Sequence, residues 1–368
     1  MSRFHIYVTW IRTAWRAVNW RLREKRLRPK DEAPAGPPGV WTTHDRWGTT
    51  AANQQEETPA SLGWLDHNKF VRMFVWRRLF GDVAGDTWGE KASSSFSLPR
   101  GHWLSLGAGS GNIEIQMGLC GLYDSMLALE ASPQAVDVAN QTAKARGLSN
   151  LEFAIADLNT VRLPRGKFDV IHVNMALHHV SSLERLSFEI NRALKPGGVF
   201  VANEFVGPNQ FQFSDERLSL VKDALLMIPE DMRYDPVAKI TKQEYPRYPR
   251  KHWRDWDPTE SIRSDEIPRI LEMNFPELKA HQYGGSILNL ALENIVQHFD
   301  LDDPSHVELM QRLVKFESDL IDSGRIQSDF VYFVCPKGPQ TALFRGWLAA
   351  KFDLRRRVTM SLRNRSLG

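Results

Sequence analysis

Cysteine is scarce in this chain of 368 residues, since only Cys120 and Cys335 are present. They lie far apart and form no Cys-x-x-Cys pair or Cys/His cluster, which argues against a disulfide framework and a structural zinc site. We expect no bound metal. No run of 18 or more apolar residues occurs, and the N-terminus lacks the apolar stretch and cleavage site of a signal peptide. We therefore expect a cytoplasmic protein.

Charge is unevenly distributed, although the formal net charge is only +3. Residues 1–30 and 341–368 carry nine and seven Lys or Arg, against one acidic residue each. The body, 31–340, holds the remaining 31 basic and 42 acidic residues, a net charge of −11. Because nucleic-acid binding relies on basic side chains that neutralise phosphates, we expect no nucleic acid as a partner of the body.

The two basic ends predict amphipathic helices. In segment 1–40 a helix precedes a Pro/Gly-rich linker, and apolar residues recur at spacings of three and four. The tail 339–368 likewise combines apolar residues with arginines. Such helices suit peripheral contact with an anionic membrane, at its inner face. Docking against the acidic body, or a solvated tail, stays open as an alternative.

Segment 101–206 alternates short apolar runs with helical patterns, as a doubly wound α/β sheet requires. The patterns predict five strands and three intervening helices. The strands are expected at 102–106, 125–130, 151–155, 168–173 and 198–204, and the helices at 111–121, 132–146 and 183–194.

Three further segments flank this core. We expect a helical extension in 41–100, with a helix near 65–79 and a loose Ser-rich stretch at 93–97. Residues 207–260 interrupt the alternation and are expected to form a lid over the carboxyl ends of the strands. Segment 261–338 completes the fold, with helices at 262–274, 287–299 and 304–322 and strands near 278–283 and 328–335.

The most informative motif follows the first predicted strand. It consists of Leu106, Gly107, Ala108, Gly109, Ser110 and Gly111, and it opens into a helix. Glycines at alternate positions let the chain turn sharply and let a ligand approach backbone N–H groups. By itself such a turn is a weak indicator of a nucleoside site.

Acidic residues at the ends of the next two strands strengthen this indication. Glu130, which precedes Ala131, can accept hydrogen bonds from ribose hydroxyls, and Asp157, which precedes Leu158, from an adenine amine. Ligands of open α/β sheets bind at the carboxyl ends of the strands, where both acids fall. The alternatives are a solvated strand-end charge for Glu130 and a turn cap for Asp157.

These residues together resemble the class I S-adenosylmethionine-dependent methyltransferases, and more narrowly a bacterial group with a Leu-His-His turn after strand four. The resemblance implies a Rossmann-like, doubly wound seven-stranded sheet whose last strand is antiparallel. It implies that the glycine turn holds the methionine part of the cofactor, S-adenosyl-L-methionine. It assigns the ribose to Glu130, the adenine to Asp157 and Leu158, and the surroundings of the sulfonium to Asn174 and Met175.

The chain departs from the family at one position. Ser105 stands where an Asp or Glu two residues before the first glycine is usual, and Glu114 is a candidate replacement for the missing charge. Motifs such as Asn203–Asn209 and Asp257–Ser264 further resemble a subset associated with bacterial surface glycans. The resemblance therefore implies O-methylation of a sugar, a glycan-linked molecule or another small polar acceptor.

Methyl transfer to a hydroxyl gains from alignment of the acceptor and from a base that removes its proton. His178 and His179, after the fourth strand, are the candidates, and His178 is preferred because imidazole titrates near neutral pH. Glu204, at the end of the fifth strand, is the second choice. Packing or helix capping by the histidines remains open, as do an NAD-type oxidoreductase and an inactive scaffold with this fold.

Overall fold

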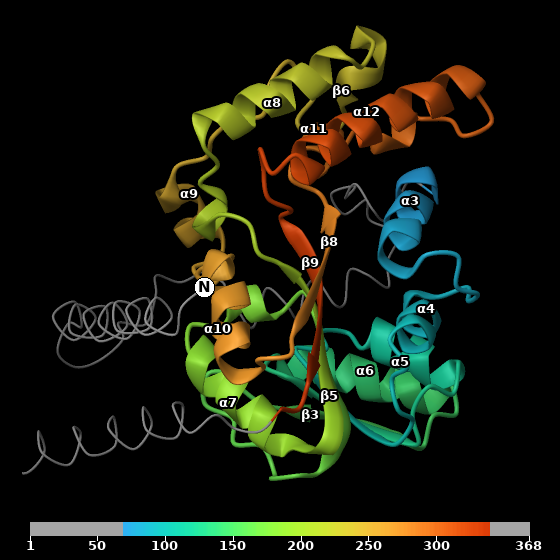
Figure 1. Cartoon of the computed structure of the whole chain (residues 1–368), viewed down its shortest axis with the longest axis vertical. Helices are drawn as coiled ribbons and strands as arrows, with labels where there is room; N and C mark the ends of the chain where they lie inside the picture. Colours follow the sequence, from blue (N-terminus) through green and yellow to red (C-terminus); the bar gives the residue numbers. More distant parts are fainter. Residues whose placement is uncertain (1–68, 339–368) are drawn as a thin grey trace, which may run out of the picture. The chain divides into compact units, whose positions relative to one another are not determined.

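The computed structural model describes residues 69–338. A seven-stranded sheet with the order β3-β2-β1-β4-β5-β9-β8 forms its centre (Figure 1). The five strands predicted within 101–206 are all present and pair in parallel. They are β1 (His102–Leu106), β2 (Ser125–Glu130), β3 (Leu151–Ile155), β4 (Phe168–Asn174) and β5 (Leu194–Phe205).

The remaining two strands run as the Rossmann-like prediction requires. The last strand, β9 (Phe330–Pro336), pairs antiparallel with both β5 and β8 (Lys279–Gly284). The central strands are covered on both faces, so their sequences are almost continuously apolar, and Leu104, Ile171 and Phe200 are fully buried. The predicted fold class is confirmed.

Helices cover the two faces of the sheet (Figure 1). On one face lie α5 (Asn112–Leu119) and α6 (Pro133–Ala145), within the larger apolar core. On the other lie α7 (Leu183–Ala193) and α10 (Ile267–Asn274), within a second apolar core. The loops at the carboxyl ends of β1, β2 and β4 are thereby held between two packed layers.

The helical extension that precedes the sheet consists of two helices in the described residues. In α3 (Lys69–Phe80), Val71, Val75 and Leu79 are buried at helical spacing and belong to the larger core. The second helix is α4 (Trp88–Ser95), which begins at Thr87 with a capping box. The part of the predicted 65–79 helix before residue 69, and the helices predicted in 1–40 and 339–368, lie outside the described residues.

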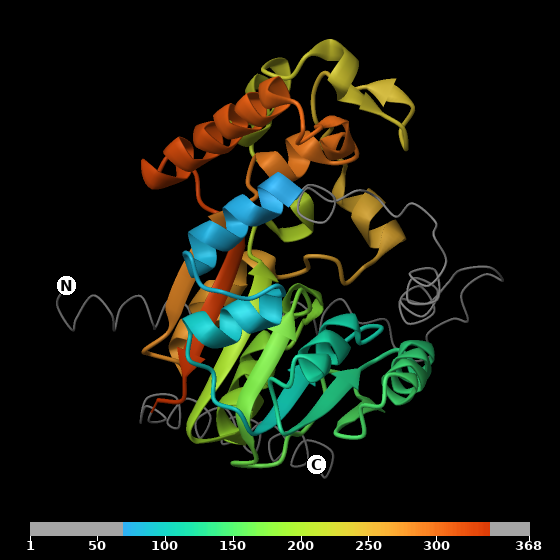
Figure 2. The same cartoon turned by 90° about the vertical axis from the view of Figure 1, so that its right-hand side faces the viewer.

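A helical layer lies beyond one end of the sheet (Figures 1 and 2). It contains α8 (Asp215–Leu226), α11 (Leu288–Leu292) and α12 (Pro304–Asp322). The buried carboxylate of Glu317 in α12 accepts hydrogen bonds from the backbone N–H groups of Gly285, Ile287 and Leu288. One acidic side chain therefore satisfies the donors at the start of α11.

Several predicted boundaries are wrong. The stretch 93–97 is not loose throughout, because α4 extends to Ser95. The helix predicted at 262–274 begins only at Ile267, after the 3₁₀ turn η4 (Ser264–Glu266). The one predicted at 287–299 is broken into α11 and η5 (Val296–His298), since Asn294 has a positive φ of 59°. Residues 207–260, called the insertion below, also contain α9 (Arg250–Trp256) and a small hairpin of β6 (Tyr234–Asp235) and β7 (Ile240–Thr241).

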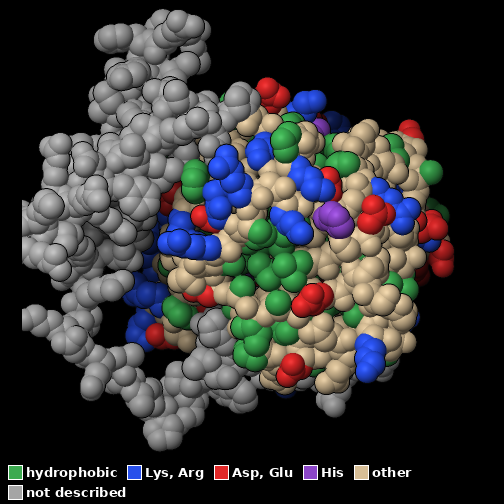
Figure 3. Space-filling view, turned by 90° about the horizontal axis from the view of Figure 1, so that it is seen from below, with side chains coloured by type: hydrophobic (Ala, Val, Ile, Leu, Met, Phe, Trp, Pro, Cys, Tyr) green, Lys and Arg blue, Asp and Glu red, His purple; other side chains and the backbone are tan. Residues whose placement is uncertain are grey.

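Two surface observations bear on the expected surroundings of the protein. Within 69–338, no helix combines the length and apolar character needed to cross a bilayer. On the face seen from below, Lys and Arg side chains are interspersed with Asp and Glu (Figure 3). This face therefore carries both signs of charge rather than a continuous basic patch.

Candidate cofactor and acceptor site

The glycine turn after β1 requires glycine for two different reasons. Gly107, Gly109 and Gly111 all have positive φ, between 55° and 78°. A Cβ on Gly107 would lie 2.4 Å from Cβ of Ala176, and one on Gly111 would lie 2.4 Å from Cζ of Phe153. At Gly109 a Cβ would meet no protein atom within 4 Å. The first and third glycines thus allow close packing, whereas the middle one leaves open space.

Glu130 joins the glycine turn to the end of β2. Its Oε2 accepts a 2.9 Å hydrogen bond from the amide of Gly109, and its Oε1 accepts from the amides of Ala131 and Ser132. The carboxylate is therefore held in one orientation at the edge of the sheet. Hydrogen bonds to charged groups contribute about 1.5–3 kcal/mol each, so this bridge fixes the shape of the turn.

A cavity of about 180 Å³ lies beside this bridge. The sequence-predicted residues Gly107, Gly109, Glu130, Ala131, Asp157, Leu158 and Met175 all line it. Asp157 also caps a turn, because its Oδ1 accepts from the amide of Asn159. The turn-cap role of Asp157 is therefore compatible with its predicted contact with adenine. Leu106 is buried in β1, and Ala108 donates its N–H to the carbonyl oxygen of Leu129, so both support the turn from behind.

The departure from the family pattern at Ser105 is matched by a neighbouring acid. The hydroxyl of Ser105 lies 2.6 Å from Oε1 of Glu114, which comes from the first turn of α5. Both side chains are buried, and burial raises the pKa of Glu114 to about 7. The carboxyl group of Glu114 therefore lies next to position 105, where the family usually has an acidic residue.

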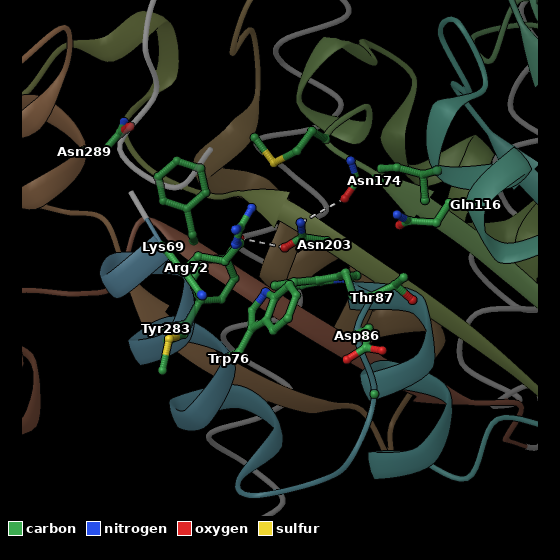
Figure 4. Close-up of a pocket in the computed structure, with 16 residues that line it drawn as sticks. Lys69, Arg72, Trp76, Asp86, Thr87, Gln116, Asn174, Asn203, Tyr283 and Asn289 are labelled. Atoms are coloured by element: carbon green, nitrogen blue, oxygen red, sulfur yellow. Dashed lines mark hydrogen bonds between the residues drawn. The ribbon is translucent and has the colours of Figure 1, made fainter. Parts of the chain in front are cut away.

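A second cavity, of about 820 Å³, opens beyond the end of β4 (Figure 4). Arg72 and Trp76 reach it from α3, Thr87 and Trp88 from the start of α4, Gln116 from α5 and Tyr283 from β8. The guanidinium of Arg72 lies 5.8 Å from the ring centroid of Trp76. Sequence analysis missed the residues from α3 and α4. The buried stripe of α3 and the Thr87-x-x-Glu90 capping box were the signals for these helices.

A chain of hydrogen bonds forms the inner wall of the larger cavity. The hydroxyl of Tyr283 donates to Oδ1 of Asn203 at 2.7 Å, and Nδ2 of Asn203 donates to Oδ1 of Asn174 at 2.9 Å (Figure 4). Met175 follows Asn174 with a φ of 54°, which is strained for a residue other than glycine. Its side chain lines both cavities, so the two spaces adjoin at the end of β4.

The three predicted base candidates lie together, and none of them lines the larger cavity. Oε2 of Glu204 is 2.8 Å from Nδ1 of His178, and its Oε1 accepts from the amides of Ala176 and Leu177. Glu204 therefore holds the 3₁₀ turn η1 (Leu177–His179) at the end of β4. His178 and Glu204 are buried and absent from the linings of both cavities, whereas His179 lines the smaller one.

The end of the insertion packs against the two histidines. Nδ1 of His179 lies 3.2 Å from Oγ1 of Thr259, whose hydroxyl donates to Asp257 at 2.7 Å. The carboxylate of Glu260 lies 3.7 Å from Nε2 of His178 and 3.8 Å from Nε2 of His179. Glu260 was noticed in the sequence only as part of a motif and not as a site residue.

The aromatic residues of the insertion pack mainly on one another. The ring of Trp253 lies 4.6 Å from that of Phe211, and Tyr248 stacks on His252 at the same separation. Thr259 brings the insertion to the smaller cavity, while the lining of the larger one contains no residue of 207–260. A lid role for the insertion stays a prediction.

Comparison with known proteins agrees with this geometry. Residues 104–202 match the family model described as a methyltransferase domain. An uncharacterized methyltransferase, YcgJ, of Bacillus subtilis is 27% identical over 105 residues, which are 28% of this chain and 41% of the relative. A demethylmenaquinone methyltransferase of Thermus thermophilus is 27% identical over 110 residues, 30% of this chain and 50% of the relative. The matches thus span half or less of these relatives' lengths.

Solved structures include a Haemonchus contortus phosphoethanolamine N-methyltransferase in complex with S-adenosyl-L-methionine. It is 14% identical, with a TM-score of 0.44, and the match covers 76% of this chain and 60% of that one. The glycine turn lies within the matched residues 104–202, directly after β1. Residues 104–202 therefore match a methyltransferase domain, set in the seven-stranded sheet whose last strand is antiparallel.

Proposed function

We propose that the whole chain is an S-adenosylmethionine-dependent methyltransferase acting on a polar acceptor bound in the larger cavity. The observation that carries this proposal is that Met175 lines both cavities. Adenosine fits the smaller cavity, between Glu130 and Asp157, and the methionine part then extends past Gly107 and Asn174. The activated methyl group would point into the larger cavity, where the acceptor is aligned to attack the methyl carbon in line with the breaking bond to sulfur.

The lining of the larger cavity supports a ring-shaped acceptor with polar groups. Trp76 and Trp88 contribute aromatic surface, and Asn174 and Asn203 contribute amide groups. Arg72 adds a cation that suits an anionic substituent. A sugar or a glycan-linked molecule has these features, so O-methylation of such an acceptor remains our proposal. A quinol-like ring would use the aromatic surface but form fewer hydrogen bonds with the polar residues of the lining.

The proposed chemistry depends mostly on alignment. The acceptor oxygen attacks the methyl carbon while the bond from that carbon to sulfur breaks, and the oxygen loses its proton to a base. The histidine pair stays the proposed source of the base in the metal-free chain. Because neither histidine lines the larger cavity, the acceptor hydroxyl would have to extend to the smaller cavity, which His179 lines. Glu204 orients the imidazole of His178, and His179 is the member that lines the cofactor cavity.

The test is a turnover assay with S-adenosylmethionine carrying a labelled methyl group. Candidate acceptors are sugar nucleotides, lipid-linked sugars, free sugars and quinols. We expect label transfer to a sugar-containing acceptor, together with release of S-adenosylhomocysteine. Transfer to quinols alone would overturn the acceptor class. Cofactor binding without transfer to any acceptor would favour an inactive scaffold, and NAD binding without S-adenosylmethionine binding would favour an oxidoreductase.

The proposed location is the cytoplasm, with contact between the basic ends and the inner face of the membrane. The charge of 1–30 and 341–368 supports this proposal. Flotation with vesicles containing anionic lipid tests it, with neutral vesicles as the control. Deletion of 1–30 should reduce flotation on anionic vesicles, and equal flotation on both vesicle types would contradict the proposal.

A further inference from the structure

Two imidazoles and a carboxylate converge at the point where the insertion meets the η1 turn. Their facing atoms, Nε2 of His178, Nε2 of His179 and the oxygens of Glu260, give separations of 3.7 and 3.8 Å. One ligand atom from each of the three side chains lies within 4.8 Å of the others. Separations of 3.7 and 3.8 Å are too long for direct hydrogen bonds between these groups.

The separations fit a metal ion at the centre of the cluster. Bonds of about 2.1 Å in a tetrahedral arrangement place neighbouring ligand atoms about 3.4 Å apart. Since the ligand atoms lie within 4.8 Å of one another, the three side chains would need to move together by at most about 1.4 Å to reach this spacing. Two imidazole nitrogens and one carboxylate form a known donor set for Zn²⁺, with a fourth position left for water or another oxygen ligand.

The outer nitrogens of both histidines have the partners that metal ligands typically have. Nδ1 of His178 lies 2.8 Å from Glu204, and Nδ1 of His179 lies 3.2 Å from the hydroxyl oxygen of Thr259. The hydroxyl of Thr259 itself donates to Asp257, so its oxygen is left to accept from Nδ1–H. Both imidazoles are thereby favoured in the tautomer that carries its hydrogen on Nδ1 and a lone pair on Nε2.

Charge at the cluster also favours a cation. The side chains of Glu204, Asp257 and Glu260 surround the two imidazoles and are only 0%, 1% and 11% exposed. Oδ2 of Asp257 is buried without a hydrogen-bond partner and lies 4.0 Å from Nδ1 of His179. Buried carboxylates are costly unless a positive charge compensates them, and a divalent ion supplies that charge.

We propose that His178 and His179, through Nε2, and Glu260, through its carboxylate, bind a divalent transition-metal ion of the zinc type. The ion would tie the insertion to the η1 turn beside the smaller cavity, which His179 and Thr259 line. With the ion bound, both Nε2 atoms hold metal rather than accept a proton. Metal binding and base catalysis by these histidines are therefore alternatives for the same atoms.

The experiment measures zinc bound to the full chain after chelation, dialysis and titration with ZnCl₂. We expect a single tight site per chain and a higher melting temperature with zinc. Co²⁺ at the same site should give the intense visible absorption of a tetrahedral complex. Glu260→Gln should weaken zinc binding at least tenfold, whereas Glu277→Gln, on an exposed carboxylate, should leave it unchanged.

A second variant guards against a general loss of folding. Thr259→Val removes the partner of Nδ1 of His179 and one donor to Asp257, whose Oδ1 keeps the backbone N–H of residue 259. It should weaken zinc binding by about 10–100-fold, with the metal-free melting temperature nearly retained. The proposal is overturned if no tight site exists, or if Glu260→Gln and Glu277→Gln bind zinc equally. Calorimetry with S-adenosylmethionine on the same samples separates this outcome from failure of the proposed function, since zinc binding requires no methyl transfer.

Discussion

The hydroxyl of Ser105 and the carboxyl group of Glu114 form a buried hydrogen bond of 2.6 Å beneath the glycine turn. Ser105 is the last residue but one of β1, and Glu114 comes from the first turn of the following helix. We propose that Glu114, once ionised, compensates the ammonium of the cofactor's amino acid in place of the usual strand-end acid. The pair therefore makes cofactor binding depend on pH.

Glu114→Gln should remove this pH dependence. Burial raises the pKa of Glu114 to about 7, so the wild-type carboxyl group is partly protonated near neutral pH. Affinity for S-adenosylmethionine should rise between about pH 6 and pH 8 as the group ionises. In Glu114→Gln the affinity should be lower and nearly flat over this range. Calorimetric titrations at several pH values measure it, and an unchanged rise in the variant would contradict the assignment.

The same group predicts how stability changes with pH. The pKa of Glu114 is higher in the folded state than the ordinary glutamate value of 4.5, so the folded state binds the proton more tightly. The free energy of unfolding should fall between about pH 4.5 and pH 7 by an amount of order 3 kcal/mol, and level off above. Denaturant unfolding of wild type and Glu114→Gln checks this, since only the wild type should show this contribution.

Gly109→Ala should weaken cofactor binding without a clash inside the protein. A Cβ at Gly109 meets open space in the ligand-free cavity, so it would occupy room that the cofactor needs. We expect at least a tenfold loss of affinity for S-adenosylmethionine. Gly147→Ala is the matched control, because Gly147 also has a positive φ and open space around it but lies after α6. Equal affinity in the two variants would contradict the placement of the cofactor.

Arg72→Ala should affect the acceptor and not the cofactor. Arg72 lines the larger cavity, whereas Arg77 on the same helix forms an exposed ion pair with Asp82. Loss of one charged contact of about 1–1.4 kcal/mol should raise KM for the acceptor roughly five- to tenfold. Affinity for S-adenosylmethionine should stay unchanged in Arg72→Ala, and Arg77→Ala should leave both constants unchanged. Equal effects of the two substitutions would exclude the larger cavity as the acceptor site.

Glu204→Gln should destabilise the turn after β4. The carboxylate of Glu204 accepts from two backbone amides and lies against Nδ1 of His178, whereas an amide side chain has only one accepting oxygen. We expect a loss of about 1–3 kcal/mol in the free energy of unfolding. Glu152→Gln, on an exposed position of β3, is the control. Denaturant titration measures both, and equal stability would show that the buried carboxylate is dispensable.

The sequence was sufficient for the sheet because its strands are short apolar runs bounded by clear turn signals. In 101–206 each predicted strand matches an observed one within a few residues. Glu130 and Asp157 lie at the edge of the sheet where the parallel strands end. Parallel pairing brings those ends together, so the shared lining of the smaller cavity follows from strand order alone. Helices outside the sheet were harder, since α9 has no buried residue and α11 is only five residues long.

The larger cavity and the histidine cluster depend on contacts that sequence spacing does not reveal. Arg72 and Tyr283 are separated by more than 200 positions yet line one space. Glu260 reaches the histidines because the backbone N–H of Ile262 donates to the carbonyl oxygen of His178 across the fold. Local periodicity carries no information on such pairings, which arise only when the insertion folds back onto the sheet.

Isothermal titration calorimetry of the purified full chain with S-adenosylmethionine tests the central claim most directly. The account predicts saturable binding of one cofactor per chain, weakened at least tenfold by Gly109→Ala and not by Gly147→Ala, with no comparable binding of NAD. Absence of binding to the wild-type chain, under conditions where its melting is cooperative, would contradict it.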